Sequence, residues 1–317
     1  MRRLAVALTA LTVAASPALA QNGCPAGALT QTRDLQCNAA DLFAYMAPQL
    51  GTAVAGGSHT LGLGTTVGGL PHFAVALRMN LVAGTTPDLE PLGAVNSTPG
   101  SNLGTNGAAL AFPTVDASVG LFKGIGLGVT RIGGVDLLAS ATYVPEVETD
   151  GISIAPADGS LKIGYGVRVG LLQQSLIVPG VTFSYLKRDL PTVSLQAGAS
   201  GVNFNMQDFS LTTSSWRLSA QKNLLMLQVA AGYGQDSYDA SANIGVTATG
   251  LTIPNVNASI ATKRTTMYGS LGLNLLIARV VAEVGQVSGG DITTYNTFST
   301  GPNAKRLYGS IGIRAGF

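Results

Sequence analysis

Charged residues are scarce in this chain of 317 residues, where Asp, Glu, Lys and Arg together make up 11%. A soluble domain carries about 25%, so the composition argues against an ordinary soluble enzyme. Setting Arg2 and Arg3 aside leaves 16 of the 18 basic residues against 16 acidic ones. Nucleic-acid binding rests on excess positive charge, and a chain without net charge is therefore not expected to bind nucleic acid.

Long apolar runs are also missing, with one short exception at the start. Arg2 and Arg3 precede an apolar stretch over 4–15 and the small residues of Ala18-Leu19-Ala20. This order is typical of a secretory signal peptide, and we predict cleavage after Ala20. No later run reaches the about 20 residues of a transmembrane helix.

Cysteine and histidine are rare, with two of each. Export exposes Cys24 and Cys37 to oxidation, and a disulfide closing their loop of about 14 residues would contribute roughly 3 kcal/mol. His59 and His72 lie at no metal-ligand spacing from the cysteines, and neither belongs to a nucleophile motif. We therefore predict no metal, no cofactor, no catalytic residues and no enzymatic activity.

What the sequence does contain is alternation with a period of two. In residues 161–171, apolar side chains at odd positions alternate with Lys, Gly and Arg at even ones. Ten such segments can be written: 71–83, 114–121, 135–145, 161–172, 181–187, 211–221, 224–234, 266–275, 278–287 and 306–317. Alternation of this kind fits either a soluble β-sandwich or a transmembrane β-barrel with its apolar face toward lipid.

Three features favour the barrel. The segments have the length of a tilted membrane strand, and their second face is rich in Gly and Ser. Aromatic residues fall near the strand ends, with Phe73 and Phe317 at one rim and Tyr143, Tyr165 and Tyr233 toward the other. Such girdles mark the two membrane interfaces.

The connections alternate between long and short. If the first strand rises from the periplasm, the outer loops are 84–113, 146–160, 188–210, 235–265 and 288–305, whereas the inner turns are mostly short. Loops 188–210 and 235–265 contain alternating patches, which form either tall hairpins or two further strand pairs. The prediction is therefore an all-β, antiparallel up-and-down transmembrane barrel of 10–14 strands over residues 57–317.

A short helix is predicted ahead of the barrel, over residues 38–50, with Asn38 as its cap and an end or kink near Pro48. A weak strand is predicted over 61–67. The segment 21–56 would lie either inside the lumen as a plug or in the periplasm against the barrel rim.

Two motifs carry resemblances to known families. The final strand, with Tyr308, Gly309, Ile311, Ile313 and Phe317, resembles the C-terminal assembly signal of bacterial outer-membrane proteins, which implies the barrel assembly machinery as a partner. Asn38-Ala39-Ala40-Asp41-Leu42 resembles the Asn-Pro-Ala-x-Leu element of long-chain fatty-acid transporters of the FadL type, with Ala39 in place of Pro. That resemblance implies fourteen strands, an N-terminal hatch and a lateral route for hydrophobic ligands.

Charged residues on the polar face of the alternating segments are the candidate functional residues. They are expected to face the lumen, because a charge facing lipid is costly. They would form either a selectivity ring or an interior ion-pair network, and they are Arg78, Asp116, Asp136, Lys162, Arg168, Arg217, Glu283 and Arg314.

Together these features predict a protein of the outer membrane of a Gram-negative-type bacterium, embedded in outer-membrane lipid. The expected function is passive transport of small or hydrophobic compounds, with a hydrophobic small molecule as candidate ligand. The alternative is a closed structural or surface-interaction barrel without transport.

Overall fold

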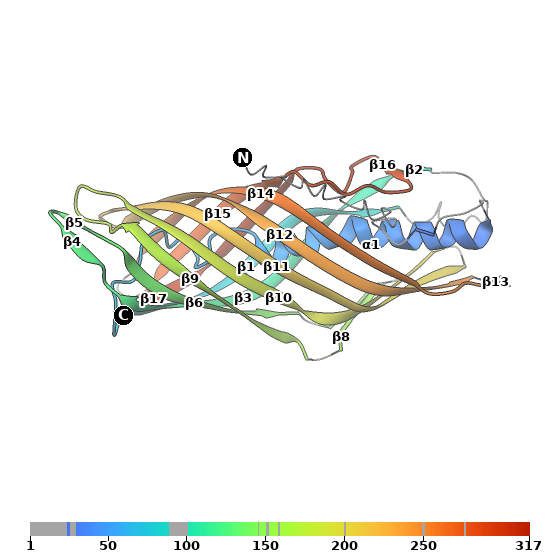
Figure 1. Cartoon of the computed structure of the whole chain (residues 1–317), viewed down its shortest axis with the longest axis horizontal. Coiled ribbons are helices and arrows are strands. Elements are labelled where there is room, and N and C mark those ends of the chain that lie inside the picture. The colour runs from blue at the N-terminus through green and yellow to red at the C-terminus, as the bar shows by residue number, and fades with distance from the viewer. Residues whose placement is uncertain are drawn as a thin grey trace, which may run out of the picture.

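Ten strands form a closed ring in the computed structural model (Figure 1). The model describes residues 24–25, 30–88, 101–144, 146–149, 152–157, 159–199, 201–248, 251–275 and 277–317. Each ring strand pairs antiparallel with its neighbours, and β17 pairs with β1, so the ring has no free edge. Its strands are β1 (Phe73–Pro87), β3 (Thr105–Phe122), β6 (Gly134–Tyr143), β9 (Leu161–Leu172), β10 (Gly180–Ala199), β11 (Val202–Leu224), β12 (Leu227–Ala248), β14 (Val256–Asn274), β15 (Arg279–Ser288) and β17 (Arg306–Gly316).

The fold prediction is confirmed, at the lower end of its strand range. The loops predicted over 188–210 and 235–265 are largely tall hairpins. Strands β10 and β11 remain paired as far as Ala199 and Val202, and β12 and β14 remain paired as far as Ile244 and Val256. The hairpins are not additional strand pairs of the ring. One end of the barrel therefore carries short turns, and the other carries long hairpins.

Shorter elements decorate the two ends. A small hairpin, β4 (Ile125–Leu127) with β5 (Thr130–Ile132), extends from the short-turn end. Four further short strands lie toward the long-hairpin end (Figure 1): β2 (Asn102–Leu103), β8 (Ile152–Pro156), β13 (Leu251–Thr252) and β16 (Thr297–Phe298). Strand β7 (Val147–Thr149) pairs with β8.

The outer surface of the ring is apolar. Leu77, Ile163, Leu271 and Val284 lie on four different strands, and each side chain is more than half exposed. An apolar surface of this extent would drive association in water, whereas a bilayer solvates it. We therefore assign this face to lipid.

Aromatic side chains mark both edges of the apolar belt. Phe73 and Phe317 pack together at the short-turn edge, with ring centroids 5.3 Å apart. Trp216 and Tyr233 pack at 5.8 Å near the other edge. Beyond Tyr233 the outward positions of β12 become Gln235, Ser237 and Asp239, which is the change expected where lipid ends.

No helix in the described residues combines the length and apolarity that crossing a bilayer requires.

A single long helix lies inside the ring, toward the long-hairpin end (Figure 1). Helix α1 (Gln31–Ala55) packs against β1 and β3 on one side and β11, β12 and β14 on another, and only an interior position allows both. Its side chains are buried almost all around, as expected for a helix without a solvent face. A disulfide between Cys24 and Cys37 ties the preceding residues to its second turn.

The predicted helix boundaries were too narrow. Thr30, not Asn38, caps the helix by accepting a hydrogen bond from the Arg33 amide at 3.2 Å, and the helix continues through Pro48 to Ala55. An interior proline costs about 3 kcal/mol, but helical stability in proteins comes mainly from tertiary packing, and this helix is packed on every face.

Residues 56–72 continue through the lumen to the short-turn end and lead into Phe73, where β1 begins. The strand predicted over 61–67 is absent from this described segment. The prediction failed because arginine side chains of the wall, rather than a neighbouring strand, bind its carbonyl groups.

Placing arginine at Val167 tests the lipid-facing assignment. Val167 points outward near the middle of β9, so Val167→Arg is expected to destabilise the barrel by about 2–4 kcal/mol. The measurement is the urea unfolding midpoint of protein refolded into lipid vesicles.

Ser237→Arg is the matched control, since Ser237 also points outward but lies beyond the aromatic edge. Equal destabilisation by both variants would contradict the assignment. Gly166 is unsuitable as a control, because a Cβ atom there would lie 2.1 Å from the Tyr185 carbonyl oxygen.

Candidate functional site in the barrel lumen

Arginine side chains of the wall hold the segment that fills the lumen. Each donates to main-chain carbonyl oxygens of residues 55–65, and each is at most 5% exposed. The contacts are Arg78 to Ser58 at 2.8 Å, Arg168 to Thr65 at 3.4 Å, Arg188 to His59 at 3.5 Å, Arg217 to Ala55 and Gly57 at 3.0 Å each, and Arg314 to Leu61.

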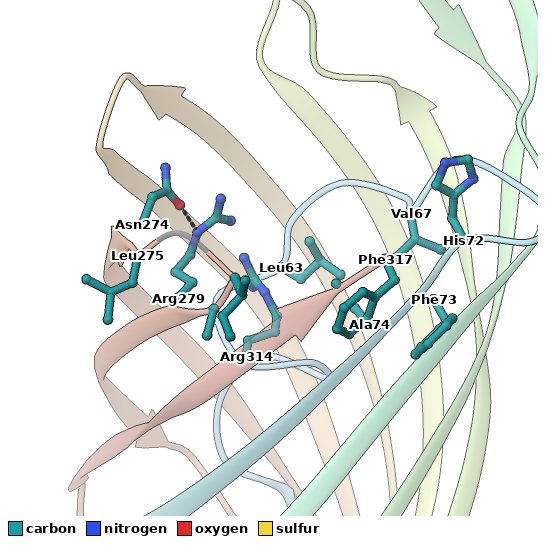
Figure 2. Close-up of a pocket in the computed structure, with 13 residues that line it drawn as sticks. Leu63, Val67, His72, Phe73, Ala74, Asn274, Leu275, Arg279, Arg314 and Phe317 are labelled. Atoms are coloured by element: carbon teal, nitrogen blue, oxygen red, sulfur yellow. Dashed lines mark hydrogen bonds between the residues drawn. The ribbon is translucent and has the colours of Figure 1, made fainter.

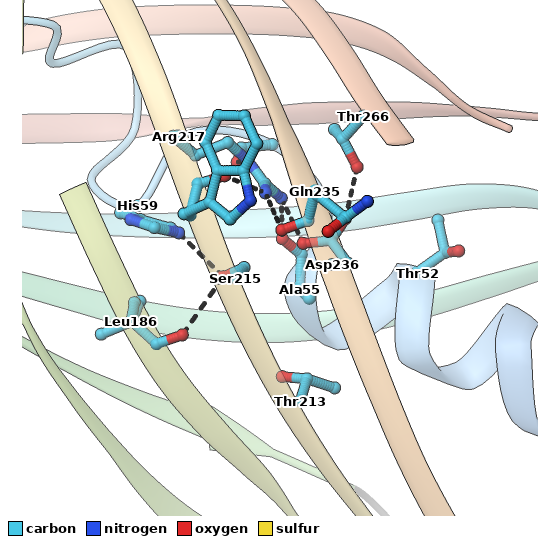
Figure 3. A network of polar contacts seen from close by, with 12 residues as sticks. Thr52, Ala55, His59, Leu186, Thr213, Ser215, Arg217, Gln235, Asp236 and Thr266 are labelled. Atoms are coloured by element: carbon cyan, nitrogen blue, oxygen red, sulfur yellow. Dashed lines mark hydrogen bonds and ion pairs between the residues drawn. The ribbon is translucent and has the colours of Figure 1, made fainter. Parts of the chain in front are cut away.

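Arg217 stands at the carboxyl end of α1, where the helix carbonyl groups concentrate negative partial charge. No basic residue lies in the last turn of the helix itself, so the wall supplies the cation. Asp236 on the adjacent strand completes the arrangement by pairing with Arg217 at 2.6 Å (Figure 3). The end of the helix is thereby fixed to β11 and β12.

Carboxylates of the wall neutralise part of the arginine charge. Asp116 lies 3.0 Å from Arg78 and 3.1 Å from Arg188, while Asp136 pairs with Arg168 at 3.3 Å. The Arg78 contact is an ion pair rather than a well-aligned hydrogen bond. All of these side chains are buried, so loss of one partner would leave an uncompensated charge away from water.

Glu283 binds the lumen segment directly. Its carboxylate accepts hydrogen bonds from the Ser58 amide at 2.9 Å and from the Ser58 hydroxyl at 2.6 Å. A Cβ atom on Gly57 would approach the Glu283 Oε1 to 2.1 Å, and Gly57 has a φ of +87°. Glycine is therefore needed at this position for both space and backbone conformation.

Among the residues that the structure describes, the buried charged side chains of the barrel wall are predominantly positive. Its buried arginines are Arg78, Arg168, Arg188, Arg217, Arg264, Arg306 and Arg314, and its buried carboxylates are Asp116, Asp136, Asp236 and Glu283. Seven cations against four anions leave an excess of three. Main-chain carbonyl groups provide much of the remaining acceptor capacity.

The structure gathers seven of the predicted candidates in the interior: Arg78, Asp116, Asp136, Arg168, Arg217, Glu283 and Arg314. The eighth, Lys162, is half-buried near the start of β9. Sequence reasoning missed Arg188, Asp236, Arg264 and Arg306. Arg188, Asp236 and Arg264 lie in regions treated as loops, and extending the strand alternation into those regions would have found them.

At the long-hairpin end, α1 is fastened to loop 289–305. The Asp41 carboxylate accepts hydrogen bonds from the Tyr295 amide at 2.8 Å and from the Asn296 amide at 2.6 Å, and Asn38 accepts one from the Asn296 side chain at 2.8 Å. Burial raises the pKa of Asp41 to about 6, although these hydrogen bonds oppose the shift. Asn38 and Asp41 thus attach the helix to this loop.

One buried histidine lies beside a serine in the lumen. His59 Nε2 lies 2.8 Å from Ser215 Oγ, but both side chains are buried and His59 Nδ1 has no hydrogen-bond partner (Figure 3). A catalytic pair needs a third group that orients the base, and no described residue forms a hydrogen bond with His59 Nδ1. Within the described residues there is also no group of three or more His, Cys, Asp or Glu side chains placed to hold a metal.

An open cavity of about 490 Å³ lies at the short-turn end, between the lumen segment, the turn after β14 and the end of β17 (Figure 2). Leu63, Val67 and Phe317 provide apolar lining, and Arg279 and Arg314 provide positive charge. His72, another histidine considered from sequence, also lines it.

No family model matches the chain, and no curated protein sequence matches it. Among solved structures, the outer-membrane protease OmpT from Escherichia coli aligns at a TM-score of 0.38 and 10% identity, covering 78% of this chain and 96% of that one. The toluene transporter TodX from Pseudomonas putida aligns at 0.33 and 9%, covering 83% and 96%. An anion-selective porin from Comamonas acidovorans aligns at 0.19 and 8%, covering 78% and 98%. Scores this low carry no functional conclusion for this chain.

Removing the Asp116 carboxylate, which Arg78 and Arg188 share, should destabilise the folded barrel. Asp116→Ala leaves Arg78 and Arg188 without their acidic partner, and we expect a loss of about 3–5 kcal/mol in unfolding free energy. Urea unfolding in phosphatidylcholine vesicles provides the measurement. The control is Asp239→Ala, an exposed carboxylate on β12, and a result matching that control would contradict the network.

The contact between α1 and loop 289–305 should depend on pH. The pKa of Asp41, about 6 in the folded protein, lies above the about 3.9 of an exposed Asp, so the folded state takes up the proton more readily. The free energy of opening should fall as pH rises from about 4 to about 6 and level off above that.

Hydrogen exchange at the Tyr295 and Asn296 amides, corrected for intrinsic rates, measures this opening. Asp41→Asn should reduce the slope, whereas Asp239→Asn should retain it. An unchanged slope in Asp41→Asn would assign the pH dependence to another group.

Proposed function

We propose that this protein is an outer-membrane barrel for passive passage of small or hydrophobic compounds, closed at rest by its own residues 31–72. The supporting observation is that the wall does not fill its own lumen. At the level of the lipid belt, a separate stretch of chain occupies the interior, and that stretch belongs to no strand of the ring.

The lining of the wall supports this proposal. Inward-facing residues at belt level include many small polar side chains, among them Ser118, Ser140, Ser184, Ser219 and Ser270. Eight strands enclose an interior that side chains alone can fill, and ten strands enclose more. Because the lining is hydroxyl-rich and cationic, water could solvate it once the segment moves.

The contacts of the lumen segment also suit reversible closure. Six of them are hydrogen bonds from guanidinium groups to main-chain carbonyl oxygens. Water can hydrogen-bond to both groups once they separate. A hydrogen bond from a charged group contributes about 1.5–3 kcal/mol net. The positive excess of the lining would then favour anionic solutes.

The alternative is a closed barrel that acts through its long hairpins. It is favoured by the apolar packing around α1, where Phe43, Leu50 and Val54 contact a core that includes Phe209 and Tyr238. Displacing the helix would expose this surface to water. The two functions differ in whether the lumen ever conducts.

Single-channel recording distinguishes them. We expect the refolded full chain to be closed and a variant lacking residues 24–66 to conduct steadily with preference for anions. Deletion of 24–30 alone is the control, since it leaves α1 and the lumen segment in place. Heat-modifiable electrophoretic mobility establishes that each variant is folded. A folded 24–66 deletion that stays silent would overturn the transport proposal in favour of the closed barrel.

The proposed setting follows from the same geometry. The short-turn end faces the periplasm and the long hairpins face outward, as in bacterial outer-membrane barrels. We also propose cleavage of residues 1–20, which lie outside the described residues, and recognition of β17 by the barrel assembly machinery.

A further inference from the structure

Two arginines face each other at the periplasmic mouth, and no Asp or Glu of the described residues forms an ion pair with either. Arg279 on β15 and Arg314 on β17 are direct partners in the strand register, a position where like charges destabilise a sheet. The ion pairs within the described residues engage Arg78, Arg168, Arg188 and Arg217, and none involves these two.

Neutral oxygens are the acceptors that these guanidinium groups find. Gln228 Oε1 accepts from both Arg279 and Arg314, Asn274 Oδ1 accepts from Arg279, and the Leu61 carbonyl accepts from Arg314. Each guanidinium has five N–H donors, and these contacts use two on each side chain. The site therefore keeps donors and two positive charges for an incoming anion.

The cavity beside this pair provides room for an apolar group. Its volume of about 490 Å³ lies within the about 300–1,000 Å³ of small-molecule sites. Leu63, Val67, Leu275 and Phe317 line it together with Arg279 and Arg314, and its described lining contains no Asp or Glu side chain (Figure 2). The two guanidinium groups suit an anionic head group, and the apolar side chains around them suit an alkyl chain.

We propose that this mouth binds an anionic amphiphile, with its carboxylate or phosphate between Arg279 and Arg314 and its chain against Leu63 and Val67. The ligand is either a free fatty-acid-type molecule or an anionic phospholipid of the surrounding bilayer. Binding here does not require an open lumen, so the inference goes beyond the transport proposal and can fail independently of it.

Photo-crosslinking in phosphatidylcholine vesicles tests the site on the full chain. The probes are diazirine-bearing dodecanoic acid and diazirine-bearing phosphatidylglycerol, and the readout is adducts on residues 61–67, which lie inside the barrel away from the lipid belt. We expect Arg279→Gln to reduce these adducts at least about tenfold, as loss of a charge-assisted contact implies.

The matched control is Arg131→Gln, an exposed arginine of β5 at the same end of the barrel, which should label like the wild type. Asn274→Asp is a second test variant, because it would supply Arg279 with an internal carboxylate and should also reduce labelling. Heat-modifiable mobility confirms that each variant is folded.

The two probes separate the sources of the ligand. Labelling by dodecanoic acid supports a free amphiphile, and labelling by phosphatidylglycerol alone supports a bilayer lipid. Equal labelling by a diazirine-bearing dodecylamine, or undiminished labelling of Arg279→Gln, would overturn the anion site. Competition by inorganic phosphate as effective as that by unlabelled dodecanoate would overturn the role of the alkyl chain.

Discussion

The need of buried guanidinium groups for acceptors organises this barrel. Among the residues that the structure describes, seven arginines of the wall are buried, and the four buried carboxylates of the wall cannot neutralise them all. An unpaired charge away from water is strongly disfavoured, and arginine stays protonated. Main-chain carbonyl oxygens of residues 55–65 supply much of the missing capacity. The lumen segment is therefore part of the electrostatic balance of the wall as well as a filler of its volume.

The interior changes character along the barrel axis. Toward the long hairpins, α1 packs in an apolar core and Asp41 attaches it to loop 289–305. At the level of the lipid belt, polar contacts between wall and segment dominate. At the short-turn end an open cavity is lined by Arg279 and Arg314, which form no ion pair with an Asp or Glu of the described residues. The polar contacts of the lumen segment therefore lie between an apolar core at one end and an open cavity at the other.

Alternation along the strands reconciles an apolar exterior with a charged interior. On β12, Val229 and Tyr233 face outward while Gln228 and Asp236 face inward, so one strand serves two environments. This alternation is local, and it made the ten ring strands predictable from sequence. It also placed Arg78, Asp116, Arg168 and Glu283 on the inner face. The helix ends and the conformation of residues 61–67 were not predictable, because they depend on what surrounds them.

The sequence by itself determined the class of fold, the face of each strand that contacts lipid and the inward position of the main charged residues. Each depends on side-chain period, which adjacent residues establish without reference to distant ones. Only the tertiary structure decided that α1 lies inside the ring, that Pro48 is tolerated within it, and which partner each arginine finds. The two arginines of the mouth are 35 positions apart in sequence, and only the pairing of β15 with β17 brings them face to face. Contacts of this kind depend on ring closure, and a local pattern contains no information about which strands will meet.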